Sequence, residues 1–295
     1  MAMSVNTNVG AMAALQALNA TTKGLSTVQS RINTGLSVAS TKDDSATYTI
    51  AQDLRADLNG LKAVTSSLNR AKSVTDVAVA GAEQISDIVN QMKTLASQAA
   101  DPGAPVESRA AYNKDFTAFR DQIEIIVNSA DFNGTNLLKT SGGSISALQS
   151  LNNAATTTSG SYVPDTLNVA NQALSLAATE TKSNGTATIG VLGKNSQINS
   201  APDAQRMVDT LVTFQDNLKG KLSELGSASR KIDSQLVFVS KLSDTIESGI
   251  GNLVDADLAK ESAKLQALQV KQQLGVQALS IANQAPQTIT SLFRS

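Results

Sequence analysis

Two long stretches of the chain carry apolar side chains at alternating steps of three and four residues. This spacing places the side chains on one face of an α-helix and is typical of helices packed side by side. A helix is predicted from Ser45 to Ala100, about 80 Å long, and it ends before DPGAP (101–105) because proline cannot continue a helix. The apolar positions of the two stretches are Leu61, Val64, Leu68, Ala71, Ala78, Ala82, Ile85, Val89, Met92 and Ala96, and then Leu218, Leu222, Leu225, Ile232, Leu236, Val239, Ile246 and Ile250.

A shorter run of the same kind lies between the two long ones, at Tyr112, Phe116, Phe119, Ile123 and Ile126. The three runs together predict a mainly α protein, a long antiparallel bundle or coiled coil formed by the N- and C-terminal segments. We expect residues 45–250 to form this bundle, with a small β-hairpin region at about 131–200. Residues 1–44 and 251–295 are expected to form a second domain of terminal helices and a connecting segment.

The hairpin region is predicted from two Asn-Gly pairs, in DFNGTNLL (131–138) and KSNGTATIGVL (182–192). Asn-Gly between apolar residues is the strongest short signal for a tight β-turn. The serine- and threonine-rich segment 140–161 is interpreted as an excursion on the surface.

Both ends of the chain have helical patterns but few charges. The only charged side chains in residues 3–36 are Lys23 and Arg31, and residues 275–293 have none. The few large aliphatic residues there do not offset the conformational entropy lost when a solitary helix becomes ordered. We therefore expect the ends to be largely disordered in the monomer and to fold when neighbouring copies bury them. Strong exchange protection of amides 3–36 in the monomer would contradict this.

The composition argues against several classes of function. The formal net charge is −1, so a nucleic-acid partner held through its phosphates is not expected. The chain has no histidine and no cysteine, which removes the commonest general base and transition-metal ligands, so neither an enzyme nor a cofactor is expected. No apolar run approaches the ~20 residues that span a bilayer, so membrane insertion is not expected. The first twenty residues lack lysine and arginine, so export without a cleaved signal peptide is expected.

A polar break separates two helical patterns at ASTKDD (39–44). A catalytic role for Asp43 and Asp44 lacks a nearby histidine or aromatic wall. The favoured interpretation is that an aspartate caps the following helix and complements its positive end. Contacts between subunits through Arg31, Lys42, Asp43 and Asp44 are an alternative that is compatible with capping. The acidic stretch DADLAKES (255–262) is also interpreted as a helix cap, because it lacks the glycine turn of a calcium loop.

Three segments together resemble the flagellin family. They are RINTGLSVASTKDDSATYTIAQDLRADLNGL (31–61), DFNGTNLL, and NLVDADLAKESAKLQALQVKQQLGVQALSIANQAPQTITSLFRS (252–295). The resemblance covers roughly residues 1–140 and 203–295 and is closest to short flagellins of alphaproteobacteria. It implies a structural subunit that polymerises into the extracellular bacterial flagellar filament used for swimming. A hook–filament junction protein, which shares the terminal helices, is the alternative.

The resemblance also implies an arrangement of layers. The terminal helices would line the axial core, the long bundle would form a surrounding tube, and residues 31–45, here called the spoke, would join them. The spoke residues in question are Arg31, Lys42, Asp43 and Asp44. Only about seventy residues separate the family-like ends, so no large outer domain is expected. The implied axial-core residues are Val5, Val9, Leu15, Leu18, Leu279, Ile281, Leu292 and Phe293.

Further partners follow from the same resemblance. Each chain would leave the cell unfolded through the flagellar type III apparatus. Many copies would then form a homopolymer. An export chaperone would cover residues 255–293, and junction and cap proteins would contact the filament.

Many flagellins are recognised by a Toll-like immune receptor through an arginine and a nearby glutamate. Here Gln91 stands in place of the arginine, Lys93 and Leu95 match in type, and Asp115 takes the place of the glutamate. Glutamine lacks the planar fork of arginine. We therefore expect this receptor site to be weakened.

Overall fold

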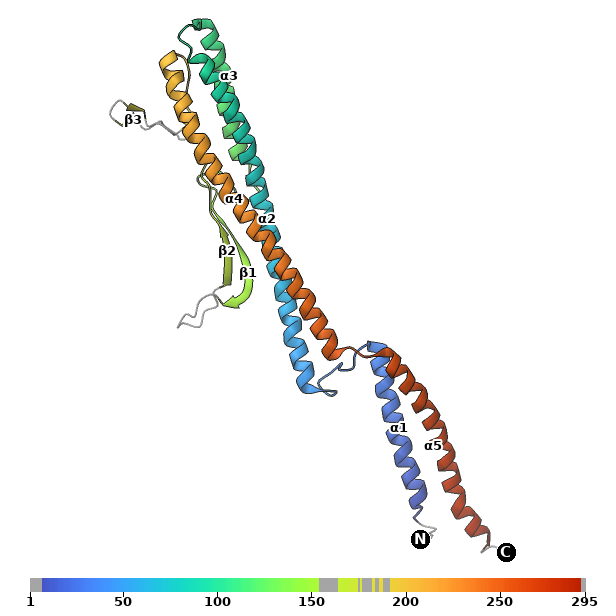
Figure 1. Cartoon of the computed structure of the whole chain (residues 1–295). Helices are drawn as coiled ribbons and strands as arrows, with labels where there is room; N and C mark the ends of the chain where they lie inside the picture. Colours follow the sequence, from blue (N-terminus) through green and yellow to red (C-terminus); the bar gives the residue numbers. More distant parts are fainter. Residues whose placement is uncertain are drawn as a thin grey trace, which may run out of the picture. The chain divides into compact units, whose positions relative to one another are not determined.

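Five helices make up most of the chain in the computed structural model (Figure 1). The structure describes residues 7–153, 164–174, 176, 182–183, 186–187 and 192–292. The predicted mainly α fold with a small β region is therefore confirmed. The helices are α1 (Val9–Thr34), α2 (Ser45–Ala99), α3 (Val106–Ser129), α4 (Ala201–Val254) and α5 (Leu258–Leu292), and the strands are β1 (Ile145–Asn153), β2 (Pro164–Val169), β3 (Lys182–Ser183) and β4 (Thr186–Ala187).

The chain divides into two compact units. Unit 1 combines Met1–Leu58 with Asp244–Ser295, and unit 2 is Asn59–Ser243. The domain division expected from the sequence, 1–44 plus 251–295 and 45–250, stays a prediction.

Within unit 2, α2 and α4 run antiparallel. Gln215 donates to Asn90 at 2.6 Å, and Lys72 pairs with Asp233 at 2.8 Å, so residue numbers rise along one helix as they fall along the other. The apolar positions that the sequence pattern assigns to α2 are buried, and so are Leu218, Leu225, Ile232 and Val239 of α4, whereas Leu222 and Leu236 are half-buried. The buried α2 residues that follow the heptad-like pattern are Leu61, Val64, Leu68, Ala71, Thr75, Ala78, Ala82, Ile85, Val89, Met92 and Ala96.

Helix α3 begins at Val106, six residues before the first apolar residue of its pattern. The corner before it is held by Arg109, whose guanidinium donates to the carbonyl oxygens of Ala99, Asp101 and Pro102 at 2.9–3.2 Å. These bonds satisfy carbonyls that are left without partners where α2 ends. The helix then buries Phe116, Ile123, Ile126 and Val127 in unit 2.

The DFNG segment forms a tight turn but not a hairpin. Asn133 and Gly134 have φ values of 52° and 80°, and Phe132 bridges to Thr135. The bridge is not extended because Asn136 turns the chain away. Its side chain donates to the Val127 carbonyl at 2.7 Å and accepts from the Leu138 amide at 2.9 Å. The other Asn-Gly hairpin is confirmed by the antiparallel pairing of β3 with β4, although Asn184 and Gly185 lie outside the described residues.

The interpretation of residues 140–161 as a surface excursion is wrong for 145–153. These residues form β1, which pairs antiparallel with β2 and packs on the bundle. Ile145 and Ala147 are buried, the Leu148 amide donates to the Ser67 hydroxyl at 3.1 Å, and the Leu151 side chain lies over Gly60. A Cβ atom at Gly60 would come within 2.7 Å of the Leu151 methyl groups, so a larger residue there would require the Leu151 side chain to move.

Within unit 1, α1 and α5 lie side by side and antiparallel (Figure 1). Asn8, which precedes α1, donates to the Ala282 carbonyl at 2.7 Å. Further along, the Leu18 side chain covers Gly275 and the Leu268 side chain covers Gly24. Val28 is the buried residue of α1. None of the helices in the described residues combines the length and apolar content that a bilayer span requires.

Candidate assembly site at the spoke and terminal helices

The spoke is tied to the connector between α4 and α5. Helix α1 ends at Gly35, whose φ of 72° is the left-handed conformation that glycine adopts easily. Beyond it, Leu36 bridges to Asp255, the Ser37 amide donates to the Val254 carbonyl at 2.7 Å, and the Ala256 amide donates to the Gly35 carbonyl at 2.9 Å. The two connectors of unit 1 therefore hold each other in a short antiparallel pairing.

A small apolar cluster lies beneath this pairing. Ala51, Ile250 and Val254 are buried, and the spoke residues Leu36 and Val38 pack against them. Sequence reasoning missed Leu36 and Val38. The alternation Leu36-Ser37-Val38 is the two-residue period of an extended segment with one buried face, and it could have identified them. The spoke is thus anchored to this cluster through two of its own large aliphatic side chains, Leu36 and Val38.

Asp43 closes a turn inside the spoke. Its carboxylate accepts from the Ser40 hydroxyl at 3.1 Å, the Ser40 amide at 3.0 Å and the Ala39 amide at 3.2 Å. These hydrogen bonds, those from Ser40 above all, hold the pKa of Asp43 below its ordinary value.

Asp44 is the residue that caps α2. Its carboxylate accepts from the Thr47 hydroxyl at 2.8 Å, the Thr47 amide at 3.1 Å and the Ala46 amide at 3.0 Å. The Thr47 hydroxyl and amide lower the pKa of Asp44, and the Ala46 amide adds to the effect. The capping interpretation is thus confirmed for Asp44. It also holds for the acidic stretch, where Asp257 accepts from the Lys260 amide at 3.1 Å at the start of α5.

We predict that Asp44→Ala frays the first turn of α2. The Ala46 and Thr47 amides lose their acceptor, so their hydrogen exchange should accelerate, while Asp44→Asn should retain most of the protection. A carboxylate with a lowered pKa stabilises the folded state above the ordinary aspartate pKa, and that stabilisation is lost as the pH falls through the lowered value. Amide exchange measured by NMR at several pH values checks both statements. Unchanged exchange in Asp44→Ala would contradict the capping role.

The two remaining spoke residues, Arg31 and Lys42, differ in whether their side chains interact with other residues of the chain. Arg31 lies in the last turn of α1, and its guanidinium is 3.6 Å from Glu261. Lys42 is exposed, and no ion pair or hydrogen bond of its side chain occurs within the described residues. Arg31, Asp43 and Asp44 are thus engaged within the chain, and Lys42 is the spoke residue that remains available to a neighbour.

The expected axial-core residues lie on both terminal helices. Val9, Leu15 and Ile281 are exposed, whereas Leu18 and Leu279 are half-buried. Val5 and Phe293 lie outside the described residues, and Leu292 is helical with a side chain that is not described. Their packing in the axial core stays a prediction.

The residues of the expected receptor site lie on two helices of unit 2. Gln91 on α2 and Asp115 on α3 are exposed, and Lys93 and Leu95 on α2 are half-buried. The predicted weakening of this site stays a prediction.

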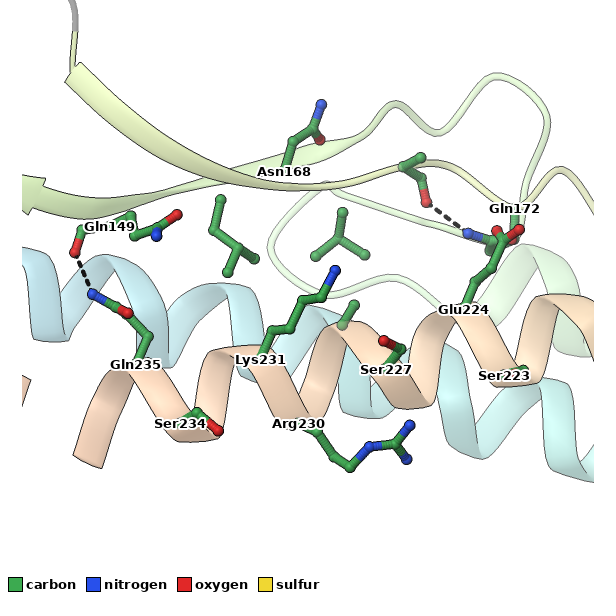
Figure 2. Close-up of a pocket in the computed structure, with 14 residues that line it drawn as sticks. Gln149, Asn168, Gln172, Ser223, Glu224, Ser227, Arg230, Lys231, Ser234 and Gln235 are labelled. Atoms are coloured by element: carbon green, nitrogen blue, oxygen red, sulfur yellow. Dashed lines mark hydrogen bonds between the residues drawn. The ribbon is translucent and has the colours of Figure 1, made fainter. Parts of the chain in front are cut away.

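Unit 2 also contains an open groove of about 860 Å³ between β2 and α4 (Figure 2). The Gln235 side chain donates to the Gln149 carbonyl at 2.8 Å and bridges helix and ribbon. Lys231 points toward the ribbon and Arg230 points away from it (Figure 2). No group of histidine, cysteine, aspartate and glutamate side chains in the described part of the chain could hold a metal ion.

Comparisons with known proteins match nearly the whole chain. Residues 5–143 match the family described as the bacterial flagellin N-terminal helical region, and residues 206–293 match the bacterial flagellin C-terminal helical region. Flagellin FljK of Caulobacter vibrioides is 45% identical over 99% of this chain and 98% of its own length. Flagellin FljM of the same organism is 41% identical with the same coverage, and a flagellin of Brucella melitensis is 34% identical over 99% of both chains.

Proposed function

This chain belongs to the bacterial flagellin family and is a structural subunit of the flagellar filament, and we propose that α1 and α5 form the innermost layer of that filament. The three relatives above are all flagellins, which favours the filament subunit over a hook–filament junction protein. The family is structural rather than enzymatic, and its place is the extracellular filament.

One observation carries the proposal for α1 and α5. Large apolar side chains on their outer faces are more than half exposed, among them Val9 at 72%, Met12 at 63% and Ile281 at 69%. Exposed apolar side chains that recur along one helix, as Val9, Met12 and Leu15 do, are typical of surfaces that bind other proteins. In a homopolymer the covering surface is the same pair of helices in neighbouring copies.

Assembly of the purified protein tests this function. A salting-out agent strengthens apolar burial because it is excluded from protein surfaces. We expect dilute monomer to form long filaments when it is added, as seen by negative-stain electron microscopy. A junction protein would not elongate, and a preparation that stays monomeric at all concentrations would contradict the proposal. Weak exchange protection of amides 7–34 in the monomer, rising strongly in filaments, would identify the helices that become covered.

Among the spoke residues, we propose that Lys42 contacts a neighbouring copy. It is exposed and has no partner among the described residues, whereas Arg31, Asp43 and Asp44 are engaged within the chain.

Lys42→Glu should therefore raise the monomer concentration needed for filament growth by roughly two- to tenfold, the range of an exposed ion pair and its reversal. The effect should shrink as salt screens the charge. The matched control is Lys62→Glu, which reverses an exposed charge on α2 in unit 2. Equal critical concentrations for the two variants, measured by sedimentation, would remove Lys42 from the interface.

The partners beyond the homopolymer are proposals of the same kind. An export chaperone would cover residues 255–293, where Leu258, Val270, Leu274 and Val276 are exposed on α5. Covering these side chains would prevent assembly before export, which we propose to occur without a cleaved signal peptide. Junction and cap proteins would meet the filament at its two ends.

Weak activation of the Toll-like receptor follows from the surface of α2. Gln91 is exposed where strongly recognised flagellins present arginine, and a neutral amide cannot make the bidentate, charged contacts of a guanidinium. We predict that Gln91→Arg increases the response of receptor reporter cells, whereas Gln84→Arg, another exposed position on α2, does not. A parental response equal to that of a strongly recognised flagellin would contradict the prediction.

A further inference from the structure

An ionic cluster around one buried carboxylate links the two terminal helices. Glu261, in the first turn of α5, is 5% exposed. Its Oε1 accepts from Lys264 Nζ at 2.6 Å and lies 3.6 Å from the Arg31 guanidinium on α1. Glu261 Oε2 and Arg31 Nε are both buried without a hydrogen-bond partner. The Glu261 carboxylate is therefore buried and incompletely satisfied, whereas the side chains of Arg31 and Lys264 remain 32% and 45% exposed.

Stability alone does not account for this cluster. Taking charges out of water offsets much of their attraction, and well-packed apolar residues of similar volume often stabilise a site equally well or better. Removing one partner, in contrast, leaves a buried charge unpaired, which is strongly unfavourable. A buried ion pair thus discriminates between arrangements in which it forms and arrangements in which it does not.

The contacts that α5 makes with α1 recur at intervals of one heptad along α5. Four α5 residues one heptad apart, Glu261, Leu268, Gly275 and Ala282, meet α1 at or beside Arg31, Gly24, Leu18 and Asn8. In the two middle contacts of this series a leucine side chain covers a glycine of the other helix. Sliding α5 by one heptad so that Gly275 faces Gly24 still places a small residue, Ala282, opposite Leu18. It also separates Glu261 from Arg31.

We propose that the Arg31–Glu261 pair sets the register of α1 against α5. The inference rests on the proposed role of these helices in the filament and adds the group that aligns them. Each copy must present the same apolar surface to its neighbours, so one register is required in every subunit. A single buried polar contact fixes register in coiled coils by the same principle.

Cross-linking can read this register directly because the chain contains no cysteine. Two pairs of cysteines serve as reporters. Gly24→Cys with Leu268→Cys cross-links in the native register, and Gly24→Cys with Gly275→Cys cross-links when α5 is shifted by one heptad. Filaments are pelleted and treated with a short bis-maleimide, and cross-links within one chain are identified by monomer mass. Each reporter pair is introduced into three backgrounds: the parent chain, the double variant Arg31→Leu with Glu261→Leu, and a control. The control is Lys72→Leu with Asp233→Leu, which removes an ion pair between helices of unit 2.

The parent and the unit 2 control should cross-link the native pair, with the shifted pair at least tenfold weaker. In the Arg31→Leu, Glu261→Leu background the shifted pair should rise at least fivefold. A shifted pair that stays at the parental level would overturn the inference. If this double variant does not assemble, the full charge reversal Arg31→Glu with Glu261→Arg and Lys264→Glu decides: filaments with native cross-linking support the inference, and their absence overturns it. Failure of the parent reporter chains to form filaments would instead count against the proposed function.

Discussion

Ile281→Asp is expected to abolish filament growth while leaving the helix content of the soluble protein nearly unchanged. Ile281 is 69% exposed on α5, so a carboxylate there is hydrated in the monomer. In a filament core the same carboxylate would be buried without a partner, which costs several kcal/mol per subunit. Each 1.4 kcal/mol is a factor of ten in affinity, so the critical concentration should rise by more than about a hundredfold. Sedimentation after salting-out measures the first effect and far-UV circular dichroism the second.

Ile281→Leu is the matched control, because it keeps an apolar side chain of similar volume and should assemble like the parent. Leu279→Asp should also prevent polymerisation, with a somewhat larger effect on the monomer since Leu279 is half-buried. Filaments of Ile281→Asp at parental concentrations would show that this face of α5 stays in water. A large loss of helix content would show that the residue supports the monomer instead.

Phe116→Ala is expected to lower the free energy of unfolding of unit 2 by about 3–5 kcal/mol. Phe116 is 0% exposed and is among the largest fully buried side chains described. Its truncation removes apolar contacts and leaves a cavity in the core that α3 helps to build. Urea unfolding followed by circular dichroism should show a clear decrease in the midpoint.

Ile125→Ala on the same helix provides the comparison. Ile125 is 57% exposed, so its truncation should change stability by no more than about 0.5 kcal/mol. Equal unfolding midpoints for the two variants would mean that the contact of α3 with the bundle contributes little to the stability of unit 2.

The long helices were predictable because their signal is local and repeated. Every large apolar residue that the period assigned to the α2 interface, from Leu61 to Met92, is buried. The start of α3 was harder to predict from the sequence, because it depends on hydrogen bonds from Arg109 to carbonyl oxygens at the end of α2. Helix capping in the spoke was predictable in type, but only the geometry separates Asp44, which caps α2, from Asp43, which closes a turn.

Contacts between distant segments explain what the sequence did not reveal. Strand β1 looks like a polar loop by composition, and its place depends on Gly60 and Ser67 of α2. Glu261 looks like an ordinary acidic residue near a helix start, and its burial depends on α1 lying alongside. Its spacing of one heptad before Leu268 was the available signal.

The pairing of the two connectors sets an order of events for a newly made chain. Ser37 and Val254 are 217 positions apart, so a chain that lacks its last fifty residues has nothing to close this junction. The bundle of unit 2 can fold from its own segments, but the terminal helices can pair only after the end of the polypeptide has been synthesised. Truncated copies are thereby kept from completing the one part of the molecule on which lengthening of the polymer depends.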